Sequence, residues 1–122
     1  MIKILLCDDE VFARDAMATL IKRKGFDVIV ASTGGECINL FEKEKPDIVF
    51  LDVMLPDVDG DHIHNYLKEL NPEVIVYYIT GSETVFTEEN ARKSGAKGYL
   101  QKPVNIDELF KTLDEIKQTF GV

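Results

Sequence analysis

Ionisable and polar side chains stand within two residues of the ends of four of the apolar runs, or just beyond, in this sequence. They are Asp8, Asp9 and Glu10 after the first run, Asp52 after the third, Thr80 after the fourth and Lys102 after the fifth. Two ionised carboxylates about 5 Å apart repel each other by roughly 3 kcal/mol at an effective dielectric of about 20, so a cluster of acids needs a compensating cation. Mg²⁺ meets that need because this hard ion takes carboxylate, carbonyl, water and phosphoryl oxygens as ligands. These residue types therefore predict a magnesium site.

Asp52 follows a fully apolar run, which suggests a carboxylate held at a fixed place in the fold. A carboxylate beside Mg²⁺ can attack phosphorus and form an aspartyl phosphate. Phosphoryl transfer asks for in-line positioning and for positive charge on the equatorial oxygens. The Lys102 ammonium can supply such charge, and the Thr80 hydroxyl can donate a hydrogen bond. The chemistry requires the fold to bring these positions together.

Five apolar runs rich in β-branched residues alternate with five helical patterns. The runs are Ile4–Cys7, Val28–Ala31, Ile48–Leu51, Val74–Ile79 and Gly98–Leu100. The first four are continuous rather than alternating, which is typical of parallel strands covered on both faces. Right-handed crossovers then favour a doubly wound α/β sheet, in which ligands sit beyond the carboxyl ends of the strands. The ionisable and polar residues named above all follow the carboxyl ends of these predicted strands.

The helical patterns differ in how much apolar surface they offer. Two stripes have three-and-four spacing: Ile63, Tyr66, Leu67 and Leu70, and then Ile106, Leu109, Phe110, Leu113 and Ile116. Thr33 with Glu36 fits a capping box, and Asn105 with Glu108 resembles one. The pattern between residues 84 and 94 is the poorest in apolar residues, so we expect this fourth helix to move most easily.

Composition limits the class of protein. The 122 residues suit one globular domain spanning 1–122, and the formal net charge of -8 disfavours direct binding to nucleic acid. No apolar run could cross a bilayer and no signal-peptide pattern is present, so we expect a cytoplasmic protein without membrane insertion.

Two pairs of residues could be interpreted as metal or redox sites. Cys7 and Cys37 are 30 positions apart, which fits neither a metal motif nor a disulfide framework, so we interpret them as reduced, packed thiols. His62 and His64, two positions apart on a helical pattern, point to different faces, and we interpret both as surface imidazoles.

Four short segments combine these features: Leu5–Glu10 (LLCDDE), Leu51–Gly60 (LDVMLPDVDG), Ile79–Gly81 (ITG) and Gly98–Pro103 (GYLQKP). Together they resemble the receiver domains of two-component response regulators, in order and in separation, over nearly the whole chain. The resemblance implies a flavodoxin-like (βα)5 three-layer sandwich with the parallel strand order 2-1-3-4-5. One residue departs from the family pattern, because Gly81 stands where Ala is more frequent.

The resemblance implies roles in phosphoryl acceptance and metal binding. Asp52 would be the phosphoacceptor and a metal ligand. Asp9 would bind Mg²⁺ directly, Asp8 would bind it as an outer or water-mediated ligand, and Met54 would bind it through its backbone carbonyl. Mn²⁺ would be able to replace Mg²⁺.

The remaining implied roles concern the phosphoryl group and the switch. Lys102 would bind a phosphoryl oxygen and would precede a cis peptide bond to Pro103, since cis bonds are almost confined to X-Pro. Thr80 and Tyr99 would form the switch pair, the hydroxyl moving toward the phosphate and the ring turning inward.

The implied function is a phosphorylation-activated switch in a phosphorelay, not an enzyme beyond slow self-dephosphorylation. A sensor histidine kinase or phosphotransfer protein would donate the phosphoryl group. A downstream output domain or protein would read the state from the fourth helix, fifth strand and fifth helix, and phosphorylation could drive homodimerisation. No output segment follows the fifth helix, so a stand-alone regulator and a fragment of a longer chain both stay open.

Two other functions fit the same fold less well. A small-molecule phosphatase with Asp52 as nucleophile generally has a second acid two residues later, where this chain has Met54. A flavin-binding module needs a phosphate-gripping loop after the first strand, where Asp8 and Asp9 would repel the flavin phosphate.

Overall fold

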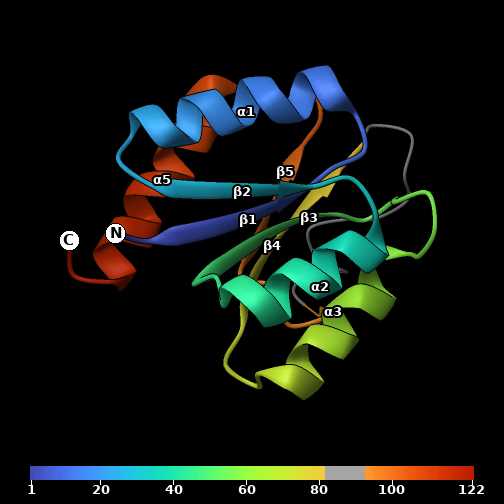
Figure 1. The fold of residues 1–122 in the computed structure, drawn as a ribbon. Helices are drawn as coiled ribbons and strands as arrows, with labels where there is room; N and C mark the ends of the chain where they lie inside the picture. The colour runs from blue at the N-terminus through green and yellow to red at the C-terminus, as the bar shows by residue number, and fades with distance from the viewer. Residues whose placement is uncertain (82–92) are drawn as a thin grey trace.

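Strands and helices alternate along the chain in the computed structural model, which describes residues 1–81 and 93–122. The elements, labelled as in Figure 1, are β1 (Lys3–Cys7), α1 (Val11–Arg23), β2 (Asp27–Ala31), α2 (Gly34–Glu44), β3 (Ile48–Asp52), α3 (Gly60–Leu70), β4 (Ile75–Thr80), β5 (Gly98–Gln101) and α5 (Ile106–Thr119). The five predicted strands are therefore confirmed. None of the helices in the described parts of the chain is long and apolar enough to cross a membrane.

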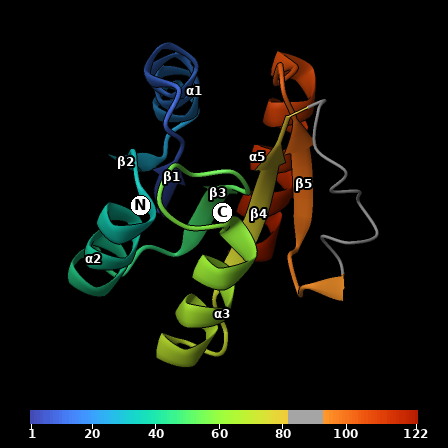
Figure 2. The ribbon, with the colours of Figure 1, turned by 90° about the vertical axis from the view of Figure 1, so that its right-hand side faces the viewer.

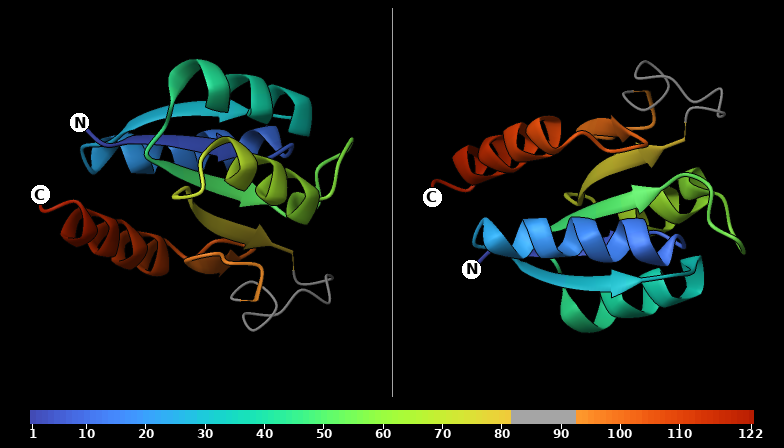
Figure 3. Two further views of the ribbon diagram at one scale, coloured as in Figure 1. Left: turned by 90° about the horizontal axis from the view of Figure 1, so that it is seen from below. Right: turned by 90° about the horizontal axis from the view of Figure 1, so that it is seen from above.

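The strands form one parallel sheet in the order β2-β1-β3-β4-β5, as expected. Helices α1 and α5 cover one face of the sheet, and α2 and α3 cover the other (Figures 1 and 2). All strand arrowheads point toward one edge, and both chain termini lie at the opposite end (Figure 3). That shared edge is where the doubly wound topology predicts the site.

Each face of the sheet carries its own apolar core. Ile4 and Leu6 of β1 pack toward α1 and α5, whereas Leu5 and Cys7 pack toward α2 and α3. All four of these side chains are fully buried, because a central parallel strand is covered on both sides. This two-sided burial explains why the strands are continuous apolar runs in the sequence.

Both predicted helix starts are confirmed by their hydrogen bonds. The Thr33 hydroxyl accepts the backbone N–H of Glu36 at 3.1 Å. The Asn105 side chain accepts the backbone N–H groups of Asp107 and Glu108 at 2.8 and 3.2 Å. The Glu36 carboxylate reaches back to the N–H of Ser32 rather than to that of Thr33, so the first motif departs from a strict capping box.

Two predictions for α3 are wrong, the burial of its whole apolar stripe and the exposure of His64. Ile63 and Leu67 are buried as expected, but Tyr66 and Leu70 are more than two-fifths exposed and His64 is only 1% exposed. The inward face of α3 therefore runs along residues 60, 63, 64 and 67. The buried face of a helix is broad enough to include residues on either side of the apolar stripe. Which of those residues are buried depends on how the helix is rotated about its axis. His62 is exposed, as predicted.

The expected fourth helix cannot be compared with the sequence prediction, since residues 84–92 of it lie outside the described residues. Its expected ease of movement stays a prediction.

Candidate functional site at the carboxyl edge of the sheet

Neighbouring strands bring the three aspartates together. β1 pairs with β3 in a register that sets Cys7 beside Leu51, so the residues that follow, Asp8 and Asp52, emerge at the same edge. One carboxylate oxygen from each of Asp8, Asp9 and Asp52 lies within 4.8 Å of the others. The convergence predicted from the strand ends is therefore present. Asp8 and Asp52 are buried, and Asp9 is exposed.

Lys102 joins this cluster from the end of β5. Its ammonium lies 2.8 Å from Asp52 Oδ2, 3.0 Å from Asp8 Oδ1 and 3.1 Å from Glu10 Oε1. Burial lowers the pKa of Lys102, but the hydrogen bonds to Asp52 and Asp8 outweigh burial and raise that pKa above its ordinary value. Lys102 is therefore held as a cation against the acids.

The backbone around Lys102 holds it at this edge. The Lys102 N–H donates to the Thr80 carbonyl at the end of β4, which continues the pairing of the two strands past β5. The peptide bond from Lys102 to Pro103 is cis, as expected.

Asp52 ends β3 with 4% of its surface exposed. Its Oδ1 accepts the backbone N–H of Met54 at 2.9 Å, and its Oδ2 accepts from Lys102. Burial raises the pKa of Asp52 above its ordinary value. Lys102 and the Met54 N–H only partly oppose this effect, and the charge of Asp8 adds to it. The carboxylate is thus fixed in orientation and faces charged neighbours, not an apolar pocket.

The donor set suits a divalent cation. Asp8 Oδ1 is held by the backbone N–H of Glu10 at 2.9 Å, which fixes that carboxylate at the rim of the cluster. Four carboxylates, those of Asp8, Asp9, Glu10 and Asp52, face the single ammonium of Lys102 within the described residues. Hard oxygen donors in excess of local positive charge are what Mg²⁺ and Mn²⁺ bind. The residues present therefore fit such an ion.

Thr80 and Tyr99 lie on the same side of the sheet. Register pairs Tyr78 with Tyr99 and Thr80 with Gln101, and paired residues of parallel strands point to the same face. Thr80 is 1% exposed and Tyr99 is half-buried against the core below α2 and α3. The predicted pair is therefore close in the sheet.

A cleft between α1 and α5 opens onto the acidic cluster. Its walls combine site residues with apolar side chains of the two helices: Asp8, Asp9, Glu10, Ala13, Ala16, Met17, Leu20, Asp52, Met54, Gly81, Lys102, Pro103, Val104, Ile106 and Leu109. Met54, predicted as a ligand through its carbonyl, has a 64% exposed surface at this rim. The cleft therefore connects Asp52 to the space between the two helices.

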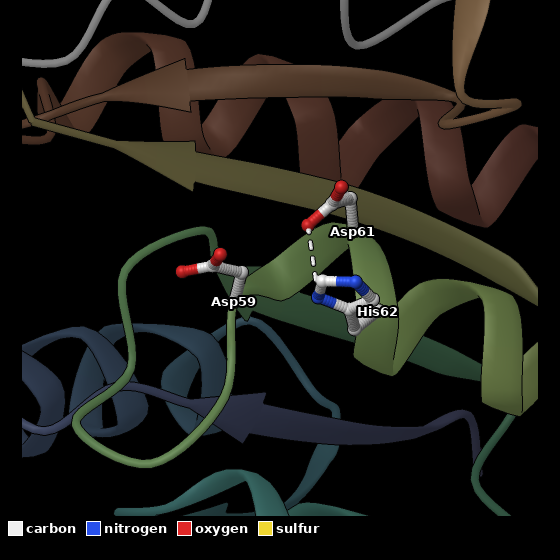
Figure 4. A group of neighbouring side chains, drawn as sticks. All are labelled: Asp59, Asp61 and His62. Carbon is white, nitrogen blue, oxygen red and sulfur yellow. Dashed lines mark ion pairs between the residues drawn. The ribbon is translucent and has the colours of Figure 1, made fainter.

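A second acidic group lies at the start of α3 (Figure 4). Asp59, Asp61 and His62 are all exposed, and His62 Nδ1 is 3.8 Å from Asp61 Oδ1. Exposed acids in a first helical turn are favourable with the helix dipole and need no ion. This group therefore gives no reason to propose a second metal site.

One contact near the site was not predicted. Asp57, in the loop after β3, accepts the backbone N–H groups of Gly34 and Gly35 at 2.7 and 3.0 Å. These hydrogen bonds lower the pKa of Asp57 and tie the loop after β3 to the first turn of α2. The residues next to Asp57 in the sequence gave no signal that it would contact Gly34, 23 positions away.

Comparison with known proteins identifies the family. A family profile described as response regulator receiver domain matches residues 4–114. The chain is 36% identical over 112 residues to the transcriptional regulatory protein TrcR of Mycobacterium tuberculosis, covering 92% of this chain and 44% of that protein. It is 35% identical over 107 residues to the alkaline phosphatase synthesis transcriptional regulatory protein PhoP of Bacillus subtilis, covering 88% and 45%. The chain thus spans about half or less of the length of these curated relatives.

Similar solved structures belong to the same family as the matching profile. The receiver domain of the Francisella response regulator 1452 superposes with a TM-score of 0.87 at 27% identity, covering 98% of this chain and 99% of that one. A CheY-like receiver domain protein from Methanospirillum hungatei gives 0.84 at 27% identity, covering 98% of each chain. The fold is the flavodoxin-like receiver fold with an acidic pocket at Asp8, Asp9 and Asp52. The chain therefore belongs to the receiver-domain family of two-component response regulators.

Proposed function

We propose that residues 1–122 form a single receiver domain that acts as a phosphorylation-activated switch, with Asp52 as the phosphoacceptor. The phosphoryl group would come from a sensor histidine kinase, the partner that membership of this family implies, or from a phosphotransfer protein. The observation that supports this most strongly is the convergence of Asp52 with Lys102, at 2.8 Å, inside a cluster of carboxylates.

The carboxylates of Asp9 and Asp52 and the backbone carbonyl of Met54 would hold Mg²⁺ or Mn²⁺, with Asp8 bound through water. A bound divalent cation neutralises charge on the oxygens of the transferring phosphoryl group. Asp8 is suited to an outer position because its Oδ1 already accepts from Glu10 N–H and Lys102. These hydrogen bonds keep its carboxylate facing the cluster.

In the transfer step, a carboxylate oxygen of Asp52 attacks the phosphorus of a phosphohistidine. The new O–P bond forms as the P–N bond breaks, and the electron pair leaves on the imidazole nitrogen. The Met54 N–H holds Asp52 Oδ1 and so aims the carboxylate. Lys102 moves from Asp52 Oδ2 onto a phosphoryl oxygen, where its charge stabilises the transition state.

The switch would act through Thr80 and Tyr99. The Thr80 hydroxyl would bind the new phosphoryl group, and the half-buried Tyr99 ring on the same sheet face would turn inward. A bound phosphoryl group biases a pre-existing equilibrium of this kind. The readout surface would comprise the fourth helix, β5 and α5, facing an output domain or protein or a second copy of this chain. Self-dephosphorylation would be slow.

The test is chemical phosphorylation of the protein. Acetyl phosphate with Mg²⁺ should add one phosphoryl group, seen by intact mass spectrometry, to the wild type but not to Asp52→Asn. Asp59→Asn is a matched control, because Asp59 is an exposed acid at the far end of the loop that follows Asp52 and lies outside the cluster. It should be phosphorylated like the wild type. Chelation of Mg²⁺ with EDTA should abolish phosphorylation of both the wild type and Asp59→Asn.

Lys102→Met tests the other member of the contact between Asp52 and Lys102. Loss of the ammonium removes charge from the phosphoryl oxygens, so phosphorylation should be much slower while the carboxylates still bind Mg²⁺. Phosphorylation of Asp52→Asn at the wild-type rate and stoichiometry, or an unchanged rate in EDTA, would contradict the proposed function.

A further inference from the structure

The two cysteines of the chain meet inside the fold. Cys7 is the last residue of β1 and Cys37 lies in the first part of α2, yet their Sγ atoms are 2.6 Å apart. Both are free thiols, and both side chains are fully buried. The chain has no other cysteine, so within one molecule each thiol has the other as its only possible disulfide partner.

The backbone on both sides of the pair is firmly held. Cys7 is paired with Ala31 of β2 on one side and Leu51 of β3 on the other. The Cys37 N–H donates to the Thr33 carbonyl in the first turn of α2. Disulfides require side chains that approach closely from two backbone segments with suitable direction. The 2.6 Å distance between the two Sγ atoms meets the first of these requirements, the close approach of the side chains.

The pair also adjoins the acidic pocket. Cys7 directly precedes Asp8, whose carboxylate contacts Lys102. On the other side, α2 begins at the glycines that Asp57 binds, and Asp57 belongs to the loop that follows Asp52. A covalent bond between β1 and α2 would therefore join two of the segments that shape the pocket.

We propose that Cys7 and Cys37 are a redox modification site, which a hydroperoxide converts reversibly into an intramolecular disulfide. One thiol, as thiolate, attacks the peroxide oxygen and becomes a sulfenic acid, releasing water or alcohol. The second thiolate attacks that sulfur, the S–S bond forms and water leaves. With hydrogen peroxide, two thiols and one peroxide give one disulfide and two waters. A dithiol reductant returns both thiols.

Burial shapes how this site would operate. Oxidant must reach sulfurs that no solvent touches in the folded state, so the reaction depends on transient opening between α2 and β1 and favours small neutral oxidants. Disulfides inside cells are usually transient and redox-sensing, which suits a bond formed only under oxidative load.

Oxidation should also alter the pocket. Because Cys7 directly precedes Asp8, a covalent bond at Cys7 would constrain the backbone that carries the Asp8 carboxylate, so the oxidised form should bind Mg²⁺ with a different affinity. This second part rests on the proposed metal site, and the reduced protein serves as its internal control.

The experiment uses the full chain, first reduced, then exposed to hydrogen peroxide, denatured and alkylated with N-ethylmaleimide. Reduced protein should carry an alkyl label on both cysteines. Oxidised protein should carry neither label, should weigh less by two hydrogen atoms before alkylation, and should yield a cross-linked peptide containing Cys7 and Cys37. Dithiothreitol should restore both labels.

Cys37→Ala is the matched variant, because its remaining thiol has no partner in the molecule and should stay alkylatable or form sulfenic acid. The wild-type mass measurement stands alone if that variant does not fold. Oxidation that gives only interchain dimers, or only sulfinic and sulfonic acids on single residues, would overturn the disulfide. An oxidised monomer that binds Mg²⁺ as tightly as the reduced one would overturn the coupling to the pocket.

Discussion

Acidification should destabilise this fold through His64. The imidazole is 1% exposed between α3 and the sheet, and its Nδ1 shares a 2.5 Å hydrogen bond with the Tyr78 hydroxyl. Its Nε2 is buried and has no hydrogen-bond partner among residues 1–81 and 93–122. A proton added to this ring would place a charge that solvent barely reaches and that no carboxylate in the described parts of the chain pairs with. Burial, with a smaller effect from the charge of Lys68, accordingly lowers the pKa of His64 from 6.5 to about 4.

The size of the effect follows from the difference in pKa between folded and unfolded states. The folded pKa is depressed, so the unfolded chain binds the proton first, and stability falls as pH decreases through the window from 6.5 to about 4. Below that window the full loss is about 3 kcal/mol, at 1.36 kcal/mol per pKa unit. At about pH 5 the loss is already about 2 kcal/mol relative to neutral pH.

Urea unfolding, followed by far-UV circular dichroism at about pH 7.5 and about pH 5, measures this loss. Other groups also titrate in that range, so the informative quantity is the difference between wild type and His64→Phe. This variant keeps a ring of similar size, does not titrate, and leaves the Tyr78 hydroxyl its hydrogen bond to Ser94. The wild type should lose about 2 kcal/mol more than the variant on acidification.

A matched control lies two residues away. His62→Gln replaces an exposed imidazole, so its pH dependence should follow that of the wild type. Equal pH dependence of wild type and His64→Phe would refute the reasoning, because it would mean that the buried ring accepts a proton without cost.

Two further predictions concern backbone contacts near the pocket. Asp57→Ala removes the acceptor for Gly34 and Gly35 N–H, and should cost about 1 kcal/mol of unfolding free energy at neutral pH, the usual cost of a lost helix cap. Because the folded pKa of Asp57 is lowered, its contribution is present above about pH 4 and is lost as pH falls further, so urea midpoints of variant and wild type should converge in acid. Gly60→Ala would set a Cβ 2.6 Å from Val53 Cα and 3.0 Å from the Asp52 carbonyl oxygen, and should cost about 1–3 kcal/mol in the same assay. Gly35→Ala, whose Cβ would meet its nearest atom at 3.7 Å, should change stability far less, and equal losses in the two variants would argue against the close approach at Gly60.

The sequence alone predicted the fold class and the aspartates that gather at the carboxyl edge of the sheet. Continuous apolar runs such as Ile48–Leu51 can be satisfied only by burial on both faces, which requires a parallel sheet between helices. The carboxyl ends of such strands share one edge, so Asp8 and Asp52 are neighbours on the adjacent strands β1 and β3, and Lys102 follows β5 at the same edge. Local capping at Thr33 and Asn105 was also readable, because each cap needs only residues within one turn.

Only the tertiary structure decided which side chains meet across elements. Whether His64 faces water or the sheet depends on a rotation of α3 that its own periodicity leaves open, since residues 63, 64 and 67 lie within one broad face. The contact between Cys7 and Cys37, and that between Asp57 and α2, join positions 30 and 22 or 23 residues apart. Sequence patterns report the environment of one element at a time, whereas these contacts arise from how the packed layers fix the relative position of two elements.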